Sequence, residues 1–214
     1  KNMEQIKSEL IGLKLSGMAY CVKTLEETKK VYELSLADGL RLLIQAEKDQ
    51  RDSNRYNRLV KNAAFRYQAS VEELSFEASR GVEQSRVLGL ATGGYIRQGE
   101  AVLITGAAGC GKSFLASALG MQACRQGFSV QYYNMQKLLL RLKVARAEGT
   151  IIRFFERLAK TELLILDDFG LASLEKQQQL DFMEIIEDRH ARRATIIASQ
   201  LPVRSWFDIF SDET

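Results

Sequence analysis

Residues 102–113 read Val-Leu-Ile-Thr-Gly-Ala-Ala-Gly-Cys-Gly-Lys-Ser, and this stretch decides the fold of the chain. An apolar run, expected to form a strand, leads into Gly-x-x-x-x-Gly-Lys-Ser, and a helical pattern follows from Phe114. Such a glycine-rich loop turns successive backbone N–H groups toward an anion, and the following helix adds its positive N-terminal end. The stretch is interpreted as a phosphate-binding P-loop. A chance glycine-rich loop is the alternative, which the flanking strand and helix disfavour.

The residues of this loop have distinct expected roles. Lys112 is expected to reach the β- and γ-phosphates of a nucleotide and to take part in catalysis. The hydroxyl of Ser113 is an oxygen ligand of the kind that Mg²⁺ prefers. We therefore expect ATP and Mg²⁺ as cofactors. The loop residues expected to bind the nucleotide are Gly106, Ala107, Ala108, Gly109, Cys110, Gly111, Lys112, Ser113 and Phe114.

A second acidic element ends an apolar run, Leu163-Leu164-Ile165-Leu166-Asp167-Asp168-Phe169. Four apolar residues in a row are typical of a strand buried on both faces of a parallel sheet, and ligands bind at the carboxyl ends of such strands. The run is interpreted as a Walker B strand, in which Asp167 holds Mg²⁺ and Asp168 orients or polarises the attacking water. A buried strand that ends in a solvated acidic turn is the alternative.

Composition indicates a globular protein. The chain has 214 residues, of which 46% are hydrophobic, and a formal net charge of +3. No apolar run approaches the ~20 residues that span a bilayer, and the first residues lack the apolar core of a signal peptide. No membrane contact is expected, and the cytoplasm is the expected compartment. Three cysteines without metal-ligand spacing indicate reduced thiols.

Two domains are expected: a helical N-terminal domain over residues 1–80 and an ATPase core over residues 81–214. Residues 1–80 show helical periodicity and no strand pattern. From Gly99 onward, strands and helices alternate, which indicates an α/β fold with a parallel sheet flanked by helices. The last strand, Ala194–Gln200, ends in polar residues expected near the γ-phosphate; an ordinary turn is the alternative.

Positive charge is concentrated in two segments. Residues 135–160 hold seven basic residues against two acidic ones. A second basic stripe follows a helical period in the N-terminal region; its basic members are Lys48, Arg51, Arg55, Arg58 and Lys61. Tyr56, Phe65 and Tyr67 alternate with the stripe and are expected either to stack on bases or to pack. The stripe itself is expected either to contact nucleic acid or an acidic partner or to be a solvated helix face. Residues 135–160 are expected either to contact DNA phosphates with little sequence specificity or to form a helical hairpin with ordinary charged faces.

Taken together, these motifs resemble the IstB family, the ATPase helper proteins of insertion-sequence transposases, and more distantly the DnaC-type helicase loaders. The resemblance spans nearly the whole chain. Besides the P-loop, it rests on Leu13-x-Leu15-Ser16-Gly17-Met18-Ala19, Phe76-x-x-x-Arg80-Gly81, Leu164-Ile165-Leu166-Asp167-Asp168-Phe169-Gly170-Leu171, and Glu187-Asp188-Arg189 through Ser199-Gln200-Leu201-Pro202.

The resemblance implies an AAA+ ATPase of the additional-strand class, with another strand between the P-loop and Walker B strands. Such a protein assembles on double-stranded DNA when it binds ATP, and it recruits or stimulates a transposase. The resemblance also implies that Ser199 occupies the sensor position, a catalytic role, and that Phe76 and Arg80 flank the adenine. The implied DNA-phosphate contacts are Lys137, Arg141, Lys143 and Arg146. The N-terminal helices would mediate self-assembly or transposase contact.

Members of the family continue past the end of this sequence into an arginine finger and a second sensor, so neither is expected within these 214 residues. None of the arginines near the end of the Glu187-Asp188-Arg189 motif is assigned as the finger. Three alternatives remain: a replicative helicase loader with the same core, a small-molecule kinase, and a nucleotide-gated DNA scaffold that does not hydrolyse ATP.

Overall fold

The computed structural model describes residues 2–76 and 81–210. Contacts divide the chain into two compact units, Lys1–Arg58 and Leu59–Thr214, and each is described here by itself. The expected boundary near residue 80 therefore differs from the one in the structure. The reason is that the segment after residue 58 packs on the α/β unit: Phe65 stacks edge-on against Tyr132, and Ala69 and Val71 enter an apolar cluster with Ala118.

The first unit is helical, as expected. Its elements are α1 (Asn2–Gly12), α2 (Ser16–Glu27), η1 (Lys30–Tyr32) and α3 (Leu36–Ala63), of which the last residues belong to the second unit. A Cβ added to Gly17 would lie 2.6 Å from the carbonyl oxygen of Ala46, so only glycine lets α2 approach α3 this closely.

Glu47 of α3 completes this packing. Its buried carboxylate accepts hydrogen bonds from the backbone N–H groups of Gly17 (2.8 Å) and Met18 (3.1 Å) at the start of α2. Arg51 donates to the other carboxylate oxygen at 2.9 Å. A negative charge at a helix N-terminus satisfies free donors and opposes the helix dipole. The Leu-Ser-Gly-Met motif therefore has a structural role, which is to seat α2 on α3.

The second unit is built on a four-stranded parallel sheet in the order β1-β4-β3-β2. Its strands are β1 (Ala101–Thr105), β2 (Val130–Asn134), β3 (Leu163–Phe169) and β4 (Ala194–Ser199). The prediction that another strand lies between the P-loop strand and the Walker B strand is confirmed, because β4 separates β1 from β3. The carboxyl ends of all four strands lie at one edge of the sheet.

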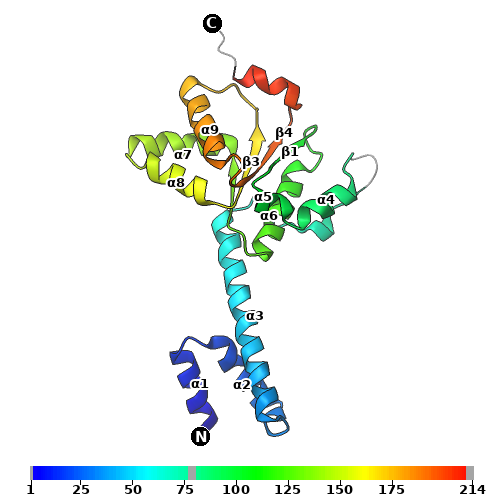
Figure 1. Cartoon of the computed structure of the whole chain (residues 1–214), viewed down its shortest axis with the longest axis vertical. Coiled ribbons are helices and arrows are strands. Elements are labelled where there is room, and N and C mark those ends of the chain that lie inside the picture. The colour runs from blue at the N-terminus through cyan, green and yellow to red at the C-terminus, as the bar shows by residue number, and fades with distance from the viewer. Residues whose placement is uncertain (1, 77–80, 211–214) are drawn as a thin grey trace. The chain divides into compact units, whose positions relative to one another are not determined.

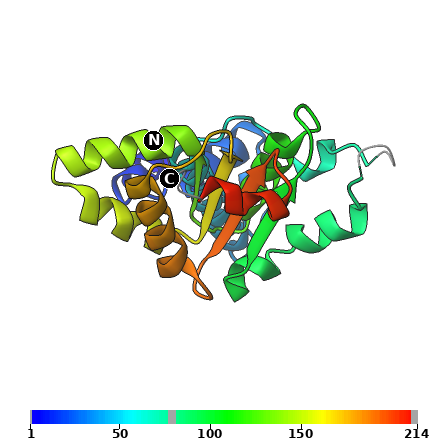
Figure 2. The ribbon, with the colours of Figure 1, turned by 90° about the horizontal axis from the view of Figure 1, so that it is seen from above.

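Helices cover both faces of this sheet (Figures 1 and 2). The helical elements of the unit are η2 (Val71–Glu73), α4 (Gln84–Ala91), α5 (Gly94–Gln98), α6 (Lys112–Arg125), α7 (Met135–Ala147), α8 (Ile151–Lys160), α9 (Lys176–Arg189) and η4 (Val203–Ile209). Helix α6 crosses one face, where Gly120 lies against Ile165. Helices α7, α8 and α9 bury the opposite face in an apolar core that includes Leu164 and Leu166.

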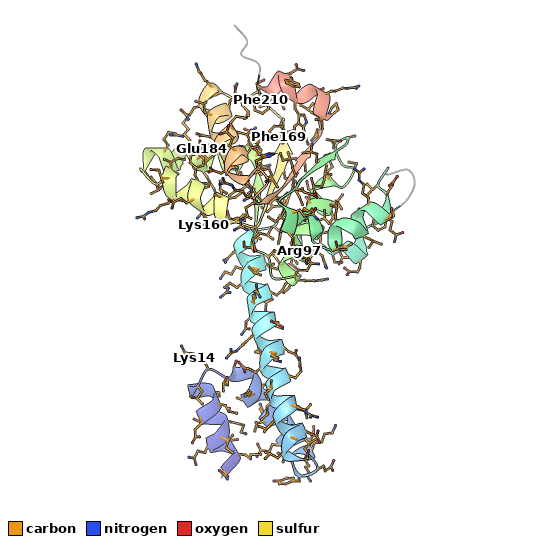
Figure 3. The ribbon with its side chains drawn as sticks, viewed as in Figure 1. Lys14, Arg97, Lys160, Phe169, Glu184 and Phe210 are labelled. Carbon is orange, nitrogen blue, oxygen red and sulfur yellow. The ribbon has the colours of Figure 1, made fainter. Side chains whose placement is uncertain are left out.

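An aromatic cluster packs between the end of β3, helix α9 and η4. Phe169, at the end of β3, lies 4.7 Å from Trp206 and 5.2 Å from Phe182 of α9 between ring centroids. Phe210 completes the cluster, and Figure 3 labels it together with Phe169. Because Phe169 directly follows the two Walker B aspartates, this packing fixes the carboxyl end of β3, on which both aspartates lie.

At the amino ends of β3 and β4, the side chain of Arg189 links several segments of the chain; only 2% of this residue is exposed. Its guanidinium donates to the carbonyl oxygens of Leu158, Thr161 (2.7 Å) and Ala194, and to the hydroxyl of Thr195 (3.0 Å). Burial lowers the pKa of Arg189 to about 10, and the nearby charge of Arg193 adds to the effect. Arg189 is therefore a structural residue, which agrees with leaving it unassigned as an arginine finger.

No helix in the described part of the chain is long and apolar enough to cross a membrane.

Candidate nucleotide-binding site

The P-loop connects β1 to α6 as the sequence predicts. Gly109 and Gly111 adopt positive φ values of 76° and 92°, which favour glycine. The N–H of Gly106 donates to the carbonyl of Ser199 at 3.3 Å, so the loop is tied to β4. Lys112 Nζ donates to the carbonyl of Ala107 at 2.6 Å, which places the ammonium group across the mouth of the loop. The predicted strand-loop-helix element is confirmed, and its lysine begins the helix with the ammonium group turned back onto the loop.

The two Walker B aspartates have different environments. Asp167 is buried and its Oδ1 accepts the N–H of Asp168 at 2.8 Å. Asp168 has a φ of +56°, uncommon for a residue with a side chain, and the β3–β4 register shifts between Leu166 and Phe169. This irregularity turns the side chain of Asp168 out of the strand alternation. The structure therefore presents one buried and one accessible carboxylate at the carboxyl edge of β3.

Tyr132 of β2 adds a group that sequence reasoning missed. Its phenol donates a hydrogen bond to Oδ2 of Asp167. Burial raises the pKa of Tyr132, and the hydrogen bond to Asp167 raises it further. Tyr132 thus remains a neutral donor to a residue expected to hold Mg²⁺. Because the two residues lie on different strands, β2 and β3, only the fold brings them together.

Asp168 has two further partners, Asn134 and Arg66. Asn134 Nδ2 donates to Asp168 Oδ2 at 2.8 Å, while its Oδ1 accepts the N–H groups of Gln136 and Lys137 at the start of α7. Arg66 Nη1 lies 3.5 Å from the same Oδ2 atom. The position of Asn134 at the end of a strand was a usable signal in the sequence. The position of Arg66 gave no such signal, because it lies 102 residues before Asp168 in the sequence.

An apolar cavity of about 520 Å³ opens on one side of the P-loop. Phe76, expected to flank the adenine, lines it together with Phe114 and Leu115 of α6 and the P-loop residues Ala107 and Cys110. Apolar and aromatic walls beside a phosphate-binding loop suit the flat face of a base. Arg80, expected at the same place, lies outside the described residues.

A second cavity, the P-loop cavity, lies on the other side of the loop and measures about 460 Å³. Its lining is Arg66, Tyr67, Ala108, Gly109, Gly111, Lys112, Ser113, Phe114, Asp168, Leu171 and Gln200. It therefore brings together the predicted residues Lys112, Ser113 and Asp168. The loop residues predicted to bind nucleotide are distributed between this cavity and the apolar one.

Ser199 does not join them. It is fully buried, and its hydroxyl donates to the carbonyl of Phe169 at 2.6 Å and accepts the N–H of Leu201 at 3.1 Å. The polar side chain at the end of β4 that lines the P-loop cavity is that of Gln200. The sensor position predicted for Ser199 is thus geometrically better matched by the next residue, because the hydroxyl of Ser199 is engaged in the turn after β4.

The predicted basic segment forms a helical hairpin, α7 and α8, but its basic residues do not share one face. Lys137 and Arg141 lie one turn apart and line a basic cavity of about 570 Å³. At 100° per residue, Lys143 and Arg146 fall on the other edge of α7. Arg146 Nη2 lies 2.6 Å from Oδ1 of the buried Asp181 on α9. Arg146 is therefore committed to an ion pair, and Lys137 and Arg141 are the predicted DNA contacts that converge.

Two aromatic residues that follow the N-terminal basic stripe, Phe65 and Tyr67, lie beside other aromatic rings. Phe65 contacts the ring of Tyr132 with centroids 6.3 Å apart, and Tyr67 lies 6.3 Å from Phe114. The guanidinium of Arg66 lies 5.3 Å from the centre of the Tyr67 ring. Of the two interpretations of these aromatics, stacking on bases or packing, the structure supports packing for Phe65, while Tyr67 remains exposed beside Phe114.

Proteins of known sequence are similar to nearly the whole chain. The sequence profile of the family described as IstB-like ATP binding protein matches residues 8–214. A protein named as the ATP-binding protein of insertion sequence IS1162 from Pseudomonas fluorescens is 41% identical over 196 residues, which cover 91% of this chain and 85% of the relative. The IS21 counterpart from Pseudomonas aeruginosa is 26% identical over 98% of this chain and 79% of the relative.

Solved structures share the fold of the second unit. DnaA from Aquifex aeolicus, bound to AMPPCP, has a TM-score of 0.61 at 22% identity; the match covers 70% of this chain and 47% of that one. The DnaC helicase loader has a TM-score of 0.56 at 23% identity and covers 67% of this chain and 85% of the loader. These likenesses show a P-loop AAA+ fold. Since the profile spans almost the entire sequence and the site carries the expected P-loop and Walker B residues, the chain belongs to the family of IstB-like ATP binding proteins.

Proposed function

We propose that this chain is an oligomeric, DNA-binding ATPase that assembles on duplex DNA when it binds ATP. The assembled protein marks the target site and recruits or stimulates a transposase during DNA transposition. One observation carries the proposal. The carboxyl ends of the strands bring together Lys112, Ser113, Asp167 and Asp168. The relatives of the chain are named ATP-binding proteins of insertion sequences.

The residues at this edge suit ATP with Mg²⁺. The apolar cavity beside Phe76 would take the base, and Lys112 with the loop N–H groups would hold the phosphates. Ser113 and the buried Asp167 would hold Mg²⁺, which would neutralise negative charge on the phosphates. Asp168, more accessible than Asp167, is suited to accept a hydrogen bond from the attacking water. Gln200 would contact the terminal phosphate from the end of β4.

DNA contact is proposed for α7 through Lys137, Arg141 and Lys143. Lysine and arginine bind the phosphate backbone without reading sequence, which suits a protein with low target specificity. Arg146 is not proposed as a contact, because it is paired with Asp181.

Self-assembly or transposase contact is proposed for the first unit. Large apolar side chains of this unit are exposed within the described structure: Ile11, Leu13, Tyr20, Tyr32, Leu36 and Leu40. Apolar side chains that gather into one exposed patch are typical of a surface that meets another protein.

Light scattering on random-sequence duplex DNA tests the proposal, with ATP, ADP or no nucleotide at one salt concentration. Large complexes are expected only when ATP and DNA are both present. Lys112→Ala should prevent this assembly, because the ammonium group that holds the phosphates is lost. Asp168→Asn should permit assembly and block phosphate release. A monomer indifferent to DNA and ATP would contradict the proposal.

Two alternative functions have distinct signatures in the same experiments. A helicase loader would also assemble, but its first unit would capture a replicative helicase rather than a transposase. A nucleotide-gated scaffold would assemble with ATP and release no phosphate with or without DNA.

A further inference from the structure

Two separate cavities adjoin the Walker B carboxylate Asp168. One is the P-loop cavity described above. The other is the basic cavity, lined by Asn62, Ala63, Ala64, Phe65, Arg66, Gln131, Tyr132, Tyr133, Asn134, Lys137, Arg141 and Asp168. The two linings have only Arg66 and Asp168 in common among the described residues. The pair formed by these two side chains therefore stands between the place expected for ATP phosphates and the basic cavity.

This pair occupies the carboxylate in a specific way. Arg66 Nη1 and Asn134 Nδ2 both approach the same atom, Asp168 Oδ2, at 3.5 and 2.8 Å. A carboxylate that orients an attacking water must offer a lone pair to that water, and a guanidinium close to the same oxygen competes for that lone pair. Arg66 in this position therefore opposes the role proposed for Asp168.

The basic cavity has the charge of an anion site. Three cations, Arg66, Lys137 and Arg141, line it against the single carboxylate of Asp168. The Arg141 guanidinium lies 5.9 Å from the centre of the Tyr133 ring, which restrains its direction. Side-chain amides of Asn62 and Gln131 supply further polar groups. Arginine and lysine side chains around one cavity are suited to a phosphate group, which can accept several charged hydrogen bonds at once.

We propose that the basic cavity receives a backbone phosphate of DNA and that this phosphate controls Asp168 through Arg66. Bound phosphate pairs with Lys137, Arg141 and Arg66, and it withdraws the guanidinium from Oδ2 of Asp168. The carboxylate, still held by Asn134, then has a lone pair for the attacking water. Arg66 is a positioning residue in this account. The inference deepens the proposed function and rests on it, since it requires both ATP hydrolysis and DNA binding.

Arg66→Gln tests the restraint on Asp168. Loss of the guanidinium should raise the ATPase rate without DNA toward the DNA-stimulated rate of the wild type, and added DNA should then stimulate little. Arg66→Lys keeps a charge at the site and should restore part of the DNA dependence. Because Arg66 is about half exposed, with 52% of its side chain accessible, the substitution should leave folding intact, which thermal unfolding verifies.

The opposite rate change would overturn the inference. Arg66 also lines the P-loop cavity, and the competing role for it is to bind the terminal phosphate of ATP itself. In that case Arg66→Gln would lower the rate both with and without DNA.

The cavity itself is tested by Lys137→Gln/Arg141→Gln, with Lys143→Gln on the other edge of α7 as the matched control. At saturating DNA, the double variant should lose most of the stimulation, while the control should need more DNA yet reach the wild-type stimulated rate. Without hydrolysis, the double variant should also lower the slope of log Kobs against log salt by about 1, the value for one phosphate. Equal stimulation in both variants would overturn the inference.

These outcomes separate the inference from the function on which it rests. If DNA neither binds nor stimulates the wild type, the proposed function fails. DNA could also stimulate the ATPase rate of Arg66→Gln and of the double variant by the same factor as that of the wild type. In that case only the control of Asp168 through Arg66 fails. If an acidic protein stimulates through the same residues where DNA does not, the cavity belongs to a protein partner and the phosphate assignment is wrong.

Discussion

The phenol of Tyr132 donates a hydrogen bond to the buried carboxylate of Asp167 across the neighbouring strands β2 and β3. This contact fixes the direction of one Asp167 oxygen, while the N–H of Asp168 fixes the other. Groups that orient a metal-holding carboxylate in this way affect the metal even though they do not touch it. Asp167 is therefore held in one orientation before any nucleotide binds.

Tyr132→Phe is expected to weaken Mg²⁺ binding in the presence of ATP by about tenfold, because such orienting partners contribute roughly 10- to 100-fold to metal affinity. Titration of Mg²⁺ at fixed ATP measures the effect through phosphate release. Tyr133→Phe is the matched control, since the Tyr133 hydroxyl bonds to Gln131 instead. Identical Mg²⁺ dependence in the two variants would show that Tyr132 does not position Asp167.

Gln200→Ala and Ser199→Ala are expected to have opposite profiles. Gln200 is exposed and lines the P-loop cavity, so its loss should leave stability within about 0.5 kcal/mol and lower ATP turnover about tenfold or more. Ser199 is buried and bonded to Phe169, so its loss should cost about 1–2 kcal/mol of unfolding free energy. Urea unfolding and single-turnover hydrolysis measure both. Loss of turnover confined to Ser199→Ala at full stability would return the sensor role to Ser199.

Arg189→Met is expected to destabilise the second unit by about 3 kcal/mol or more, because it strips hydrogen bonds from several buried carbonyl groups. Urea unfolding followed by the fluorescence of Trp206, the single tryptophan, reports on this unit. Arg192→Met, at an exposed position three residues later, is the control and should change stability by less than about 0.5 kcal/mol. Equal stability of the two variants would contradict the structural role of Arg189.

Glu47 gives the first unit a pH dependence with a definite sign. The side chain of Arg51 lowers the pKa of Glu47 most, and the N–H groups of Met18 and Gly17 lower it further. A group whose pKa is lower in the folded state stabilises the fold above its unfolded pKa, and it loses this contribution as the pH falls through the folded value. Helix unfolding followed by circular dichroism should therefore show wild-type stability falling below about pH 4.5.

Glu47→Gln isolates this contribution. The amide can still accept hydrogen bonds from the start of α2, but it carries no charge. The variant should have a lower free energy of unfolding than the wild type at pH 7. The difference between the two free energies should shrink as the pH falls through the acid range. A difference that stays constant with pH would show that the charge of Glu47 plays no part.

Much of the site could be predicted from the sequence, because its chemistry lies in contiguous motifs. The P-loop is set by glycine spacing within one turn, and the Walker B strand by an apolar run followed by two aspartates. The order of the strands followed from these motifs through the family resemblance, and the structure confirms it. Predicted strand bounds are also close to the observed ones: the strand expected over Ala194–Gln200 spans Ala194–Ser199.

Contacts between distant segments could not be predicted in this way. The approach of Arg66 to Asp168 depends on the path of the chain after α3, which carries no motif. The pairing of Arg146 with Asp181 depends on how α7 packs against α9. In the same way, Ser199 and Gln200 are adjacent and both polar, and only the turn after β4 decides which side chain faces the P-loop.

Arg189 lies at the amino ends of β3 and β4, whereas Lys112, Asp167 and Asp168 lie at the carboxyl ends of the strands. The groups that keep the sheet together and the groups suited to its chemistry are thus at opposite edges. Substitutions at the carboxyl ends of the strands can therefore alter nucleotide binding without destabilising the fold. Conversely, stabilising substitutions around Arg189, at the amino ends of β3 and β4, should raise the free energy of unfolding and leave ligand binding unchanged.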